Sequence, residues 1–236
     1  MKQRHLFILA LITGLFAMAC NSNDQSAGNN DTDSTALDSG EVEVIDTIFS
    51  AETIARFNTL PFSTYAKQQA PGFDWGNFVM TSSNTDTLHS VAFKPGKDYY
   101  NYYGALLKYS PDSSRFLDLD SYSVDVKKDS KGKLNGEALG PDTEVSLVLP
   151  DSAVKKRVLF LGPNGSVEDA VWLNNEDFAI FGVHDYGDST GKVAAIWKYN
   201  IPTHTMFLYE MPEDSVAAQK IMGYGRKERL KNLLNK

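Results

Sequence analysis

Hydrophobic residues occur in short runs along most of this chain, and turn-forming residues separate the runs. From residue 77 to residue 210 the runs are rich in Val, Ile, Phe, Tyr and Leu, and clusters of Pro, Gly, Asn, Asp and Ser lie between them. Short apolar runs of this composition between turn signals are typical of β-strands. The pattern predicts strands at 77–81, 87–93, 105–109, 115–119, 122–127, 144–149, 157–161, 168–173, 177–183, 193–199 and 205–210.

Helical patterns flank this region on both sides. Ser50 precedes 52–57, where its hydroxyl can cap a short helix that ends before Pro61. Near the other end, 215–222 has helical spacing, two glycines interrupt it, and 226–234 is again helical. No strand–helix–strand alternation occurs, so the predicted sheets are antiparallel. The expected fold class is all-β, built from antiparallel meanders with a short N-terminal helix and a C-terminal helical segment.

A short internal similarity leaves two architectures open. The segment ALLKYS at 105–110 is similar to AIWKYN at 195–200, 90 residues further on, and a turn and an apolar strand follow each copy. This spacing is about twice a β-propeller blade of about 40–45 residues. Residues 167–210 can be interpreted as one four-stranded blade, so the pattern resembles β-propeller proteins. It departs from them in lacking the Trp-Asp signature and in having fewer units than the usual range of about 4–8 blades. Blade-like repeats and a β-sandwich are both compatible with the pattern.

The longest apolar run, 6–18, directly follows a short basic segment that contains Lys2 and Arg4. This order is typical of a signal peptide, and the apolar run is too short to span a bilayer stably. The following residues 17–20, AMAC, resemble the lipobox of bacterial lipoproteins. The resemblance implies cleavage directly before Cys20 and acylation of its thiol, and two or more acyl chains would hold the protein stably at a membrane. The alternative is an ordinary secretory signal that leaves Cys20 unmodified.

The stretch after the cysteine predicts a tether. Residues 21–40 consist mainly of Asn, Asp, Ser, Thr and Gly and cannot bury enough apolar surface to fold. An Asp directly after the lipidated cysteine resembles an inner-membrane retention signal, but position 21 is Asn. This favours a lipid-anchored location at the outer membrane of a cell envelope. The expected organisation is a signal peptide at 1–19, a lipidated Cys20 and tether at 20–40, a β-rich domain at 41–211 and a helical tail at 212–236.

Charge and cysteine content exclude several classes of function. The chain has 23 Lys and Arg residues against 30 Asp and Glu residues, a formal net charge of -7. Loss of Lys2 and Arg4 with the signal peptide would make the mature chain more acidic still. Such a chain lacks the basic footprint that nucleic acids need, so nucleic acid is not an expected partner. Cys20 is the single cysteine, so no intramolecular disulfide can form. No cofactor is expected.

Motifs that would identify an enzyme are absent from the sequence. It lacks the Gly-x-Ser-x-Gly, His-Glu-x-x-His and Gly-rich phosphate-binding patterns. The most site-like segment offers His184, Asp185 and Asp188 in a loop after a buried strand, where an imidazole and two carboxylates could bind Ca²⁺. An ordinary β-turn would use the same residue types. Asp118, Asp120 and Asp125 alternate with apolar residues, and most of them are expected to point from the solvent face of a sheet.

Aromatic residues are concentrated in one loop-like stretch that contains Tyr99, Tyr100, Tyr102 and Tyr103, with Trp75 upstream. Tyrosine and tryptophan combine a stackable ring with a polar tip, which suits a surface that binds a glycan or a protein. Packing in the core or at a sheet edge is the alternative. The preferred interpretation is a non-catalytic, membrane-tethered binding module for a glycan or a protein of the cell envelope. The alternative function is an extracytoplasmic hydrolase with a carboxylate or Ca²⁺-assisted site at the histidine–aspartate segment.

A further resemblance concerns the source of the chain. The segment 143–183 contains TEVSLVL, RVLFLGP, VEDAVWL and DFAIFG in that order, and it is similar to uncharacterised lipoproteins of Bacteroidetes. The resemblance implies a bacterial source and an envelope location, and it implies no activity.

Overall fold

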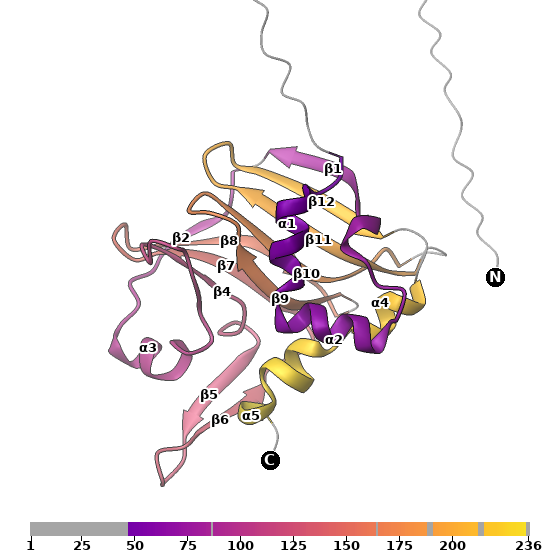
Figure 1. The fold of residues 1–236 in the computed structure, drawn as a ribbon. Helices are drawn as coiled ribbons and strands as arrows, with labels where there is room; N and C mark the ends of the chain where they lie inside the picture. The colour runs from indigo at the N-terminus through magenta and orange to yellow at the C-terminus, as the bar shows by residue number, and fades with distance from the viewer. Residues whose placement is uncertain (1–46, 86, 164, 188–190, 212–214, 235–236) are drawn as a thin grey trace, which may run out of the picture. The chain divides into compact units, whose positions relative to one another are not determined.

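The computed structural model describes residues 47–85, 87–163, 165–187, 191–211 and 215–234 (Figure 1). The chain divides into two units, Met1–Glu43 and Val44–Lys236, and all described residues belong to the second. The predicted signal peptide, lipidated Cys20 and tether lie outside the described residues. None of the described helices combines the length and the apolar character that a membrane crossing requires.

Five strands form a first sheet, which we call sheet A. Its strands lie in the order β1-β12-β11-β10-β9 and comprise β1 (Val79–Thr85), β9 (Ser166–Trp172), β10 (Asp177–Asp185), β11 (Lys192–Asn200) and β12 (Thr205–Met211). The last four strands form a meander, because each pairs with the next along the chain. β1 pairs with β12, so the first of the described strands lies beside the last.

A second five-stranded sheet, sheet B, has the order β2-β8-β7-β4-β3. Its strands are β2 (Ser90–Ala92), β3 (Lys108–Tyr109), β4 (Phe116–Asp118), β7 (Thr143–Leu149) and β8 (Val154–Leu161). The hairpin of β5 (Val124–Lys128) and β6 (Leu134–Ala138) pairs separately. All strand pairs in the described residues are antiparallel, as predicted.

Helices lie at both ends of the described chain and in one connection. They are α1 (Ala51–Asn58), α2 (Pro61–Gln69), the 3₁₀ turn η1 (Trp75–Asn77), α3 (Lys97–Tyr103), α4 (Ser215–Ile221), the π-helical turn η2 (Gly225–Arg229) and α5 (Lys231–Leu234). The Ser50 hydroxyl accepts a hydrogen bond of 3.2 Å from the backbone N–H of Thr53, which confirms the predicted cap of α1. The helical C-terminal segment is also confirmed.

Sheet A is the middle one of three layers. One face packs against α1, α2, η1 and α4 through an apolar core that includes Phe57 and Phe181. The other face packs against sheet B through a second core that includes Leu147 and Ile180. The two sheets therefore form a β-sandwich with helices on one side, and Figure 1 shows α1 in front of the strands of sheet A. The second face of sheet B, its outer face, is the one that points away from this sandwich core.

Three local predictions differ from the structure. β6 forms in the sequence LNGEA, which contains few strand-forming residues, because it pairs with β5 and packs against α5. Helices α2 and α3 form where none was predicted. The two similar segments are not equivalent, since β3 is a two-residue strand at the end of sheet B whereas β11 is a nine-residue strand inside sheet A. Of the two architectures left open, the described strands form the sandwich.

Candidate functional site

Two carboxylates lie on the outer face of sheet B. Leu117 and Leu147 point into the sandwich core, so their neighbours along β4 and β7 point the other way. These neighbours include Asp118, which is 3% exposed, and Ser146, which is 1% exposed. Glu144, two residues before Ser146, is 6% exposed on the same face. Buried carboxylates cost free energy unless they are paired and hydrogen-bonded, so their partners decide what this face can do.

Asp118 accepts hydrogen bonds from several directions. The Tyr99 hydroxyl donates to Oδ2 at 2.7 Å, and the Ser121 hydroxyl donates to the same oxygen. The backbone N–H groups of Asp120 and Ser121 donate to Oδ1 at 3.1 and 2.9 Å. Burial and the adjacent Asp118 carboxylate both raise the pKa of Tyr99, so this tyrosine remains a protonated donor at neutral pH. Asp118 therefore fixes α3 and the β4–β5 turn on the sheet.

Glu144 is held by cations. Arg157 Nε donates to Oε2 at 2.7 Å, Ser146 Oγ donates to Oε1 at 2.8 Å, and Lys155 Nζ lies 3.5 Å from Oε1. Burial alone would raise the pKa of Glu144, but the hydrogen bonds from Ser146 and Arg157 and the charge of Lys155 hold it below its ordinary value of 4.5. Lys155 Nζ also lies 4.0 Å from Asp118 Oδ2 and so links the two carboxylates.

Aromatic side chains surround these charges. The Arg157 guanidinium lies 5.2 Å from the Phe160 ring centroid, and Phe160 meets Tyr122 edge to face at 5.8 Å. Nine large hydrophobic residues are exposed in the described chain. Five of them belong to this region, namely Val91, Tyr100, Tyr109, Tyr122 and Phe160. We call these five residues together with Lys155 and Arg157 the aromatic face.

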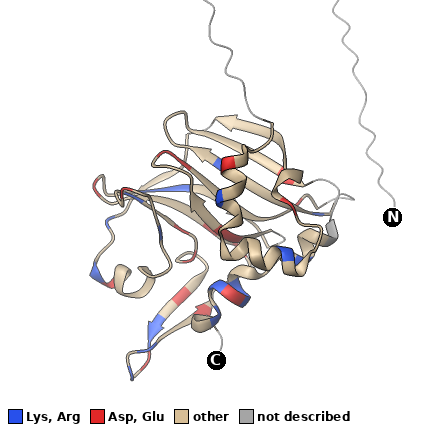
Figure 2. Cartoon of the chain, in the orientation of Figure 1, with Lys and Arg blue, Asp and Glu red and all other residues tan. Residues whose placement is uncertain are grey.

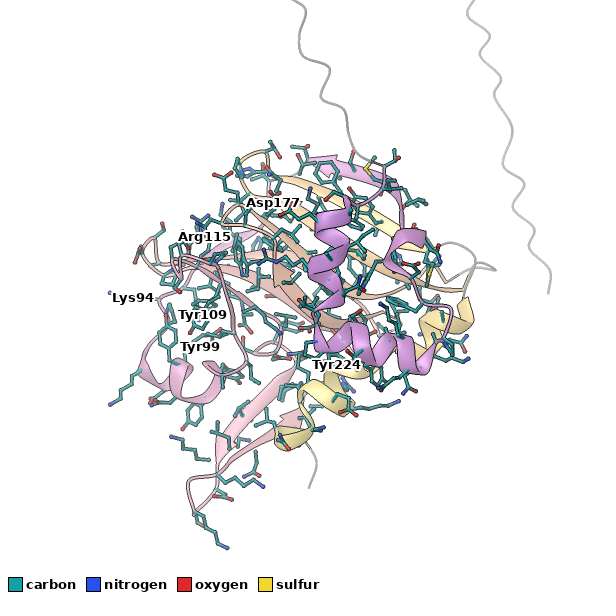
Figure 3. All side chains as sticks on the ribbon, in the orientation of Figure 1. Lys94, Tyr99, Tyr109, Arg115, Asp177 and Tyr224 are labelled. Atoms are coloured by element: carbon teal, nitrogen blue, oxygen red, sulfur yellow. The ribbon has the colours of Figure 1, made fainter. Side chains whose placement is uncertain are left out.

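The four predicted tyrosines lie on α3, but only part of the cluster faces solvent. Tyr99 and Tyr103 pack with Phe116 in a small core, and the Tyr103 hydroxyl donates to the carbonyl of Val124 at 2.9 Å. Tyr102 packs toward the β5–β6 hairpin, with the Lys128 ammonium 5.7 Å from its ring centroid. Tyr100 is 38% exposed and joins the aromatic face. Figure 3 shows Tyr99 and Tyr109 on the same side of the structure.

Trp75 lies in a different part of the molecule. It is 1% exposed in the core between the helices and sheet A, and its indole N–H donates to the Ser63 hydroxyl at 3.0 Å. Its ring packs against Phe57 and Phe181 at centroid distances of 5.2 and 5.1 Å. The structure therefore does not bring Trp75 together with the tyrosines of α3, and its indole is a core side chain.

The histidine–aspartate segment does not assemble a metal site in the described residues. The His184 ring stacks on Tyr186 at 4.4 Å, and its buried Nδ1 has no hydrogen-bond partner in the described structure. Asp185 lies 3.7 Å from Lys192 and accepts the backbone N–H of Gly187 at 2.8 Å. Asp188 lies outside the described residues. No group of three potential metal ligands occurs among the residues that the structure describes.

The expectation that Asp118 and Asp120 point to solvent is wrong. Both are 3% exposed, because α3 and the β4–β5 turn cover the first and the C-terminal segment covers the second. The alternation of polar and apolar residues along a strand indicates which face of the sheet each side chain occupies. It does not indicate which other parts of the chain cover that face. Most of the aromatic face was also not predicted. Arg157 and Phe160 lie on β8, whereas Tyr122 comes from the β4–β5 turn, and the tertiary fold brings Tyr122 against Phe160.

The fold and the site define an antiparallel β-sandwich domain with one solvent-facing surface of aromatic and paired charged residues. Comparison of the chain with protein-family models, with curated proteins and with solved structures gives no match.

Proposed function

We propose that the protein is a lipid-anchored, non-catalytic binding module of a bacterial cell envelope, and that its aromatic face binds a glycan. The main support for the proposal is the Arg157 side chain, which is half-exposed and has exposed aromatic rings beside it. Its side chain is 44% exposed, and Phe160 and Tyr122 beside it are 43% and 42% exposed. Ring faces can stack on the apolar side of a sugar while a guanidinium and tyrosine hydroxyls reach its polar groups.

The hydrogen bonds of Arg157 support a binding role. Its Nε donates to Glu144, whereas its two Nη groups donate to no acceptor in the described residues. The buried carboxylate therefore fixes the guanidinium in place and leaves its outer edge for a ligand. A guanidinium edge binds carboxylates in bidentate geometry, so acidic sugars are the glycans that this face fits best.

The carboxylates of this face are poorly suited to catalysis. Glycoside hydrolysis needs one carboxylic acid with a raised pKa as a proton donor. The pKa of Glu144 is lowered, and each of its oxygens is occupied by a donor or a cation. We therefore propose binding without catalysis.

The envelope location is supported by the sequence of the first forty residues. Their basic and apolar segments, the lipobox-like AMAC at 17–20 and the polar stretch after it are what a lipid-anchored protein requires. In a bacterial host, globomycin treatment or Cys20→Ala is expected to leave the protein without acyl chains and to release it from membranes. Retention of the Cys20→Ala protein in the membrane fraction would refute the lipid anchor.

Binding is tested on a glycan array with the chain from residue 20 onward, carrying Cys20→Ser so that it stays in solution. Acidic glycans are expected to bind, and Arg157→Gln and Tyr122→Ala are each expected to weaken binding about tenfold or more. Tyr186→Ala is the matched control, since Tyr186 is 46% exposed but directly follows β10 of sheet A and donates to Glu210 on β12. Equal binding by all these variants, or no binding of any glycan, would refute the glycan proposal and direct the search to a protein partner.

A further inference from the structure

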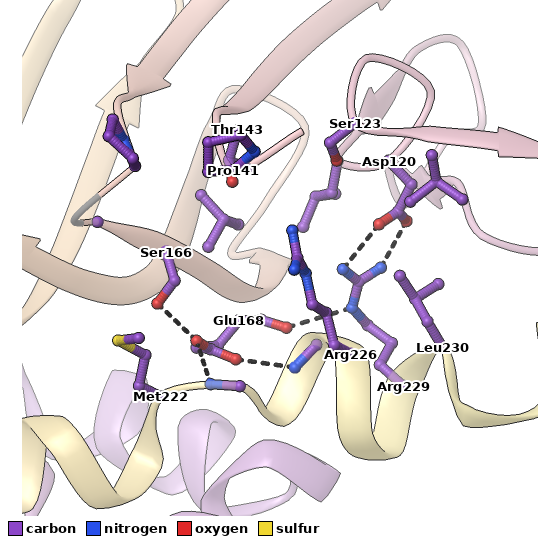
Figure 4. A pocket seen from close by; sticks show the side chains of 17 residues that line it. Asp120, Ser123, Pro141, Thr143, Ser166, Glu168, Met222, Arg226, Arg229 and Leu230 are labelled. Atoms are coloured by element: carbon purple, nitrogen blue, oxygen red, sulfur yellow. Dashed lines mark hydrogen bonds and ion pairs between the residues drawn. The ribbon is translucent and has the colours of Figure 1, made fainter. Parts of the chain in front are cut away.

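A cavity of about 180 Å³ opens between the turns that flank β9 and the C-terminal segment (Figure 4). Its walls come from the β4–β5, β6–β7 and β8–β9 turns, the beginning of β9 and the C-terminal segment 222–230. The cavity is slightly larger than the engineered cavity of about 150 Å³ that accepts a benzene molecule in another protein. We call it the end cavity.

The buried charges in its wall are already paired with protein groups. Arg229 donates to Asp120 in bidentate geometry, with Nη1 2.5 Å from Oδ2 and Nη2 2.9 Å from Oδ1. Glu168, 1% exposed, accepts the backbone N–H groups of Gly223 and Gly225 at 2.8 Å each and the Ser166 hydroxyl at 2.6 Å. Neither carboxylate therefore has to be neutralised by a ligand.

The backbone around this cavity is unusual. Gly223 has a φ of +93°, which other residues rarely adopt and which lets two nearby N–H groups converge on Glu168. The next turn is π-helical, with the Leu230 N–H donating to the Gly225 carbonyl at 2.8 Å. Single π-helical turns are rare and occur frequently at functional sites. Here the wider turn places Arg226, Arg229 and Leu230 in the cavity wall.

The polar groups that remain in the cavity are mainly donors. Arg226 makes one hydrogen bond within the described chain, from Nη2 to the Gly140 carbonyl at 3.1 Å, so most of its guanidinium N–H groups have no protein acceptor there. The hydroxyls of Ser123 and Thr143 make no hydrogen bond to the described residues. Figure 4 shows Arg226 extending from the C-terminal segment toward Thr143 and Ser123.

The rest of the wall is apolar. Leu119, Val124, Val167 and Leu230 line the cavity and are each less than 9% exposed. A ligand that fits must combine an anionic group for the guanidinium and hydroxyls with a compact apolar body for this wall. Because a planar carboxylate can accept two parallel hydrogen bonds from a guanidinium, it matches Arg226 in shape as well as in charge.

We propose that the end cavity binds a small organic carboxylate, with its carboxylate at Arg226, Ser123 and Thr143 and its apolar body against Leu119 and Val167. The size of the cavity limits this body to about one ring. None of the residues that line the cavity belongs to the aromatic face, so the proposal does not depend on glycan binding.

The test uses benzoate as the probe and benzamide as its neutral counterpart, with the chain from residue 20 onward carrying Cys20→Ser. Titration followed by NMR chemical shifts is expected to give saturable benzoate binding with shifts at residues 222–230, and at least about tenfold weaker binding of benzamide. Arg226→Gln should weaken benzoate binding by about tenfold or more, because a charge-assisted hydrogen bond is lost. Thr143→Val should weaken it by a smaller factor.

Lys227→Gln is the matched control, since it removes the same charge from the neighbouring exposed position and Lys227 does not line the cavity. It should bind benzoate as the unsubstituted protein does. Absence of saturable benzoate binding, equal binding of benzamide, or equal losses for Arg226→Gln and Lys227→Gln would overturn the proposal. The NMR spectrum of each free variant shows whether it has kept the native fold.

Discussion

Sheets A and B have the same number of strands and the same antiparallel pairing, but their surroundings differ. Sheet A is covered on both faces, so its central strands β10 and β11 are almost continuously buried. Sheet B is covered on its inner face by sheet A, whereas, within the part of the chain that the structure describes, only α3 and adjacent turns pack on its outer face. Along β8, buried and exposed positions are therefore mixed. The difference indicates that sheet A is the scaffold and that sheet B provides the surface for recognition.

The two sheets also differ in how they handle polar groups. The central strands β10 and β11 of sheet A bury apolar side chains on both faces, and the charged residues of these two strands lie mainly toward the strand ends. Sheet B carries ionised groups in the middle of its outer face and neutralises them locally through Lys155 and Arg157. Figure 2 shows residues of both signs on the β5–β6 hairpin and along the C-terminal segment as well. Ion pairs between neighbouring side chains therefore compensate the buried carboxylates on a sheet face that lies close to water.

The largest effect is expected in the core of the scaffold sheet. Phe181 is 1% exposed and contacts Phe57, Phe62 and Trp75 at centroid distances of 5.0, 5.8 and 5.1 Å. Phe181→Ala should lower the free energy of unfolding by about 3–5 kcal/mol, because it removes a buried ring and leaves a cavity. Urea denaturation measures the loss. A loss below about 1 kcal/mol would contradict the assignment of sheet A as the scaffold.

A smaller loss is expected for the ion network of sheet B. Glu144→Gln should lower the free energy of unfolding by about 1–3 kcal/mol, since it leaves Lys155 and Arg157 without their carboxylate. Glu137→Gln, at an exposed position of β6, is the control and should change it by about 0.5 kcal/mol or less. Equal effects of the two substitutions would mean that the network contributes no more than a surface charge.

The same carboxylate predicts a pH dependence. The pKa of Glu144 is lower in the folded chain than its ordinary value of 4.5, so the unfolded chain binds this proton more readily. The stabilisation by Glu144 is therefore complete above pH 4.5 and is lost as the pH falls through the folded-state pKa. Measured from neutral pH downward, the difference in unfolding free energy between the unsubstituted chain and Glu144→Gln should shrink below that pH. A difference that stays constant would refute the shift.

The smallest effect on stability is expected on the aromatic face. Phe160→Ala and Tyr122→Ala should each change the free energy of unfolding by about 1 kcal/mol or less, because both side chains are more than 40% exposed. Urea denaturation of each variant beside Phe181→Ala gives a direct comparison of the two sheets. If either variant lost as much stability as Phe181→Ala, these rings would be structural and the recognition surface would lie elsewhere.

Local sequence signals predicted much of the fold. The strands of both sheets and the cap at Ser50 follow from short apolar runs, turn residues and capping chemistry, which act within a few residues. Helix α3 was missed because its sequence KDYYNYY is rich in aromatic residues with low helix propensity, and contacts of Tyr99 and Tyr103 with sheet B stabilise it. Tertiary packing overrides propensity at this position.

The candidate site could be predicted only in part. The tyrosine cluster that the sequence singled out lies on the outer side of sheet B, as the aromatic face does. Most of its tyrosines are partly buried and make contacts within the fold, and Tyr100 alone is exposed enough to belong to the aromatic face. The sequence did not indicate that Arg157 and Phe160 belong to a binding surface, because their places in it depend on contacts with residues from other segments of the chain. The end cavity could not be predicted from the sequence either, since its walls come from four separate segments of the chain.

The pairing of the first strand with the last has a consequence for the timing of folding. Val79 on β1 lies opposite Glu210 on β12, and the Asp120–Arg229 pair joins positions 109 residues apart. Neither contact can form until Glu210 and Arg229 respectively are present, and contacts between residues distant in the sequence slow folding. The chain therefore stays incompletely folded until β12 and Arg229 are available to pair with β1 and Asp120.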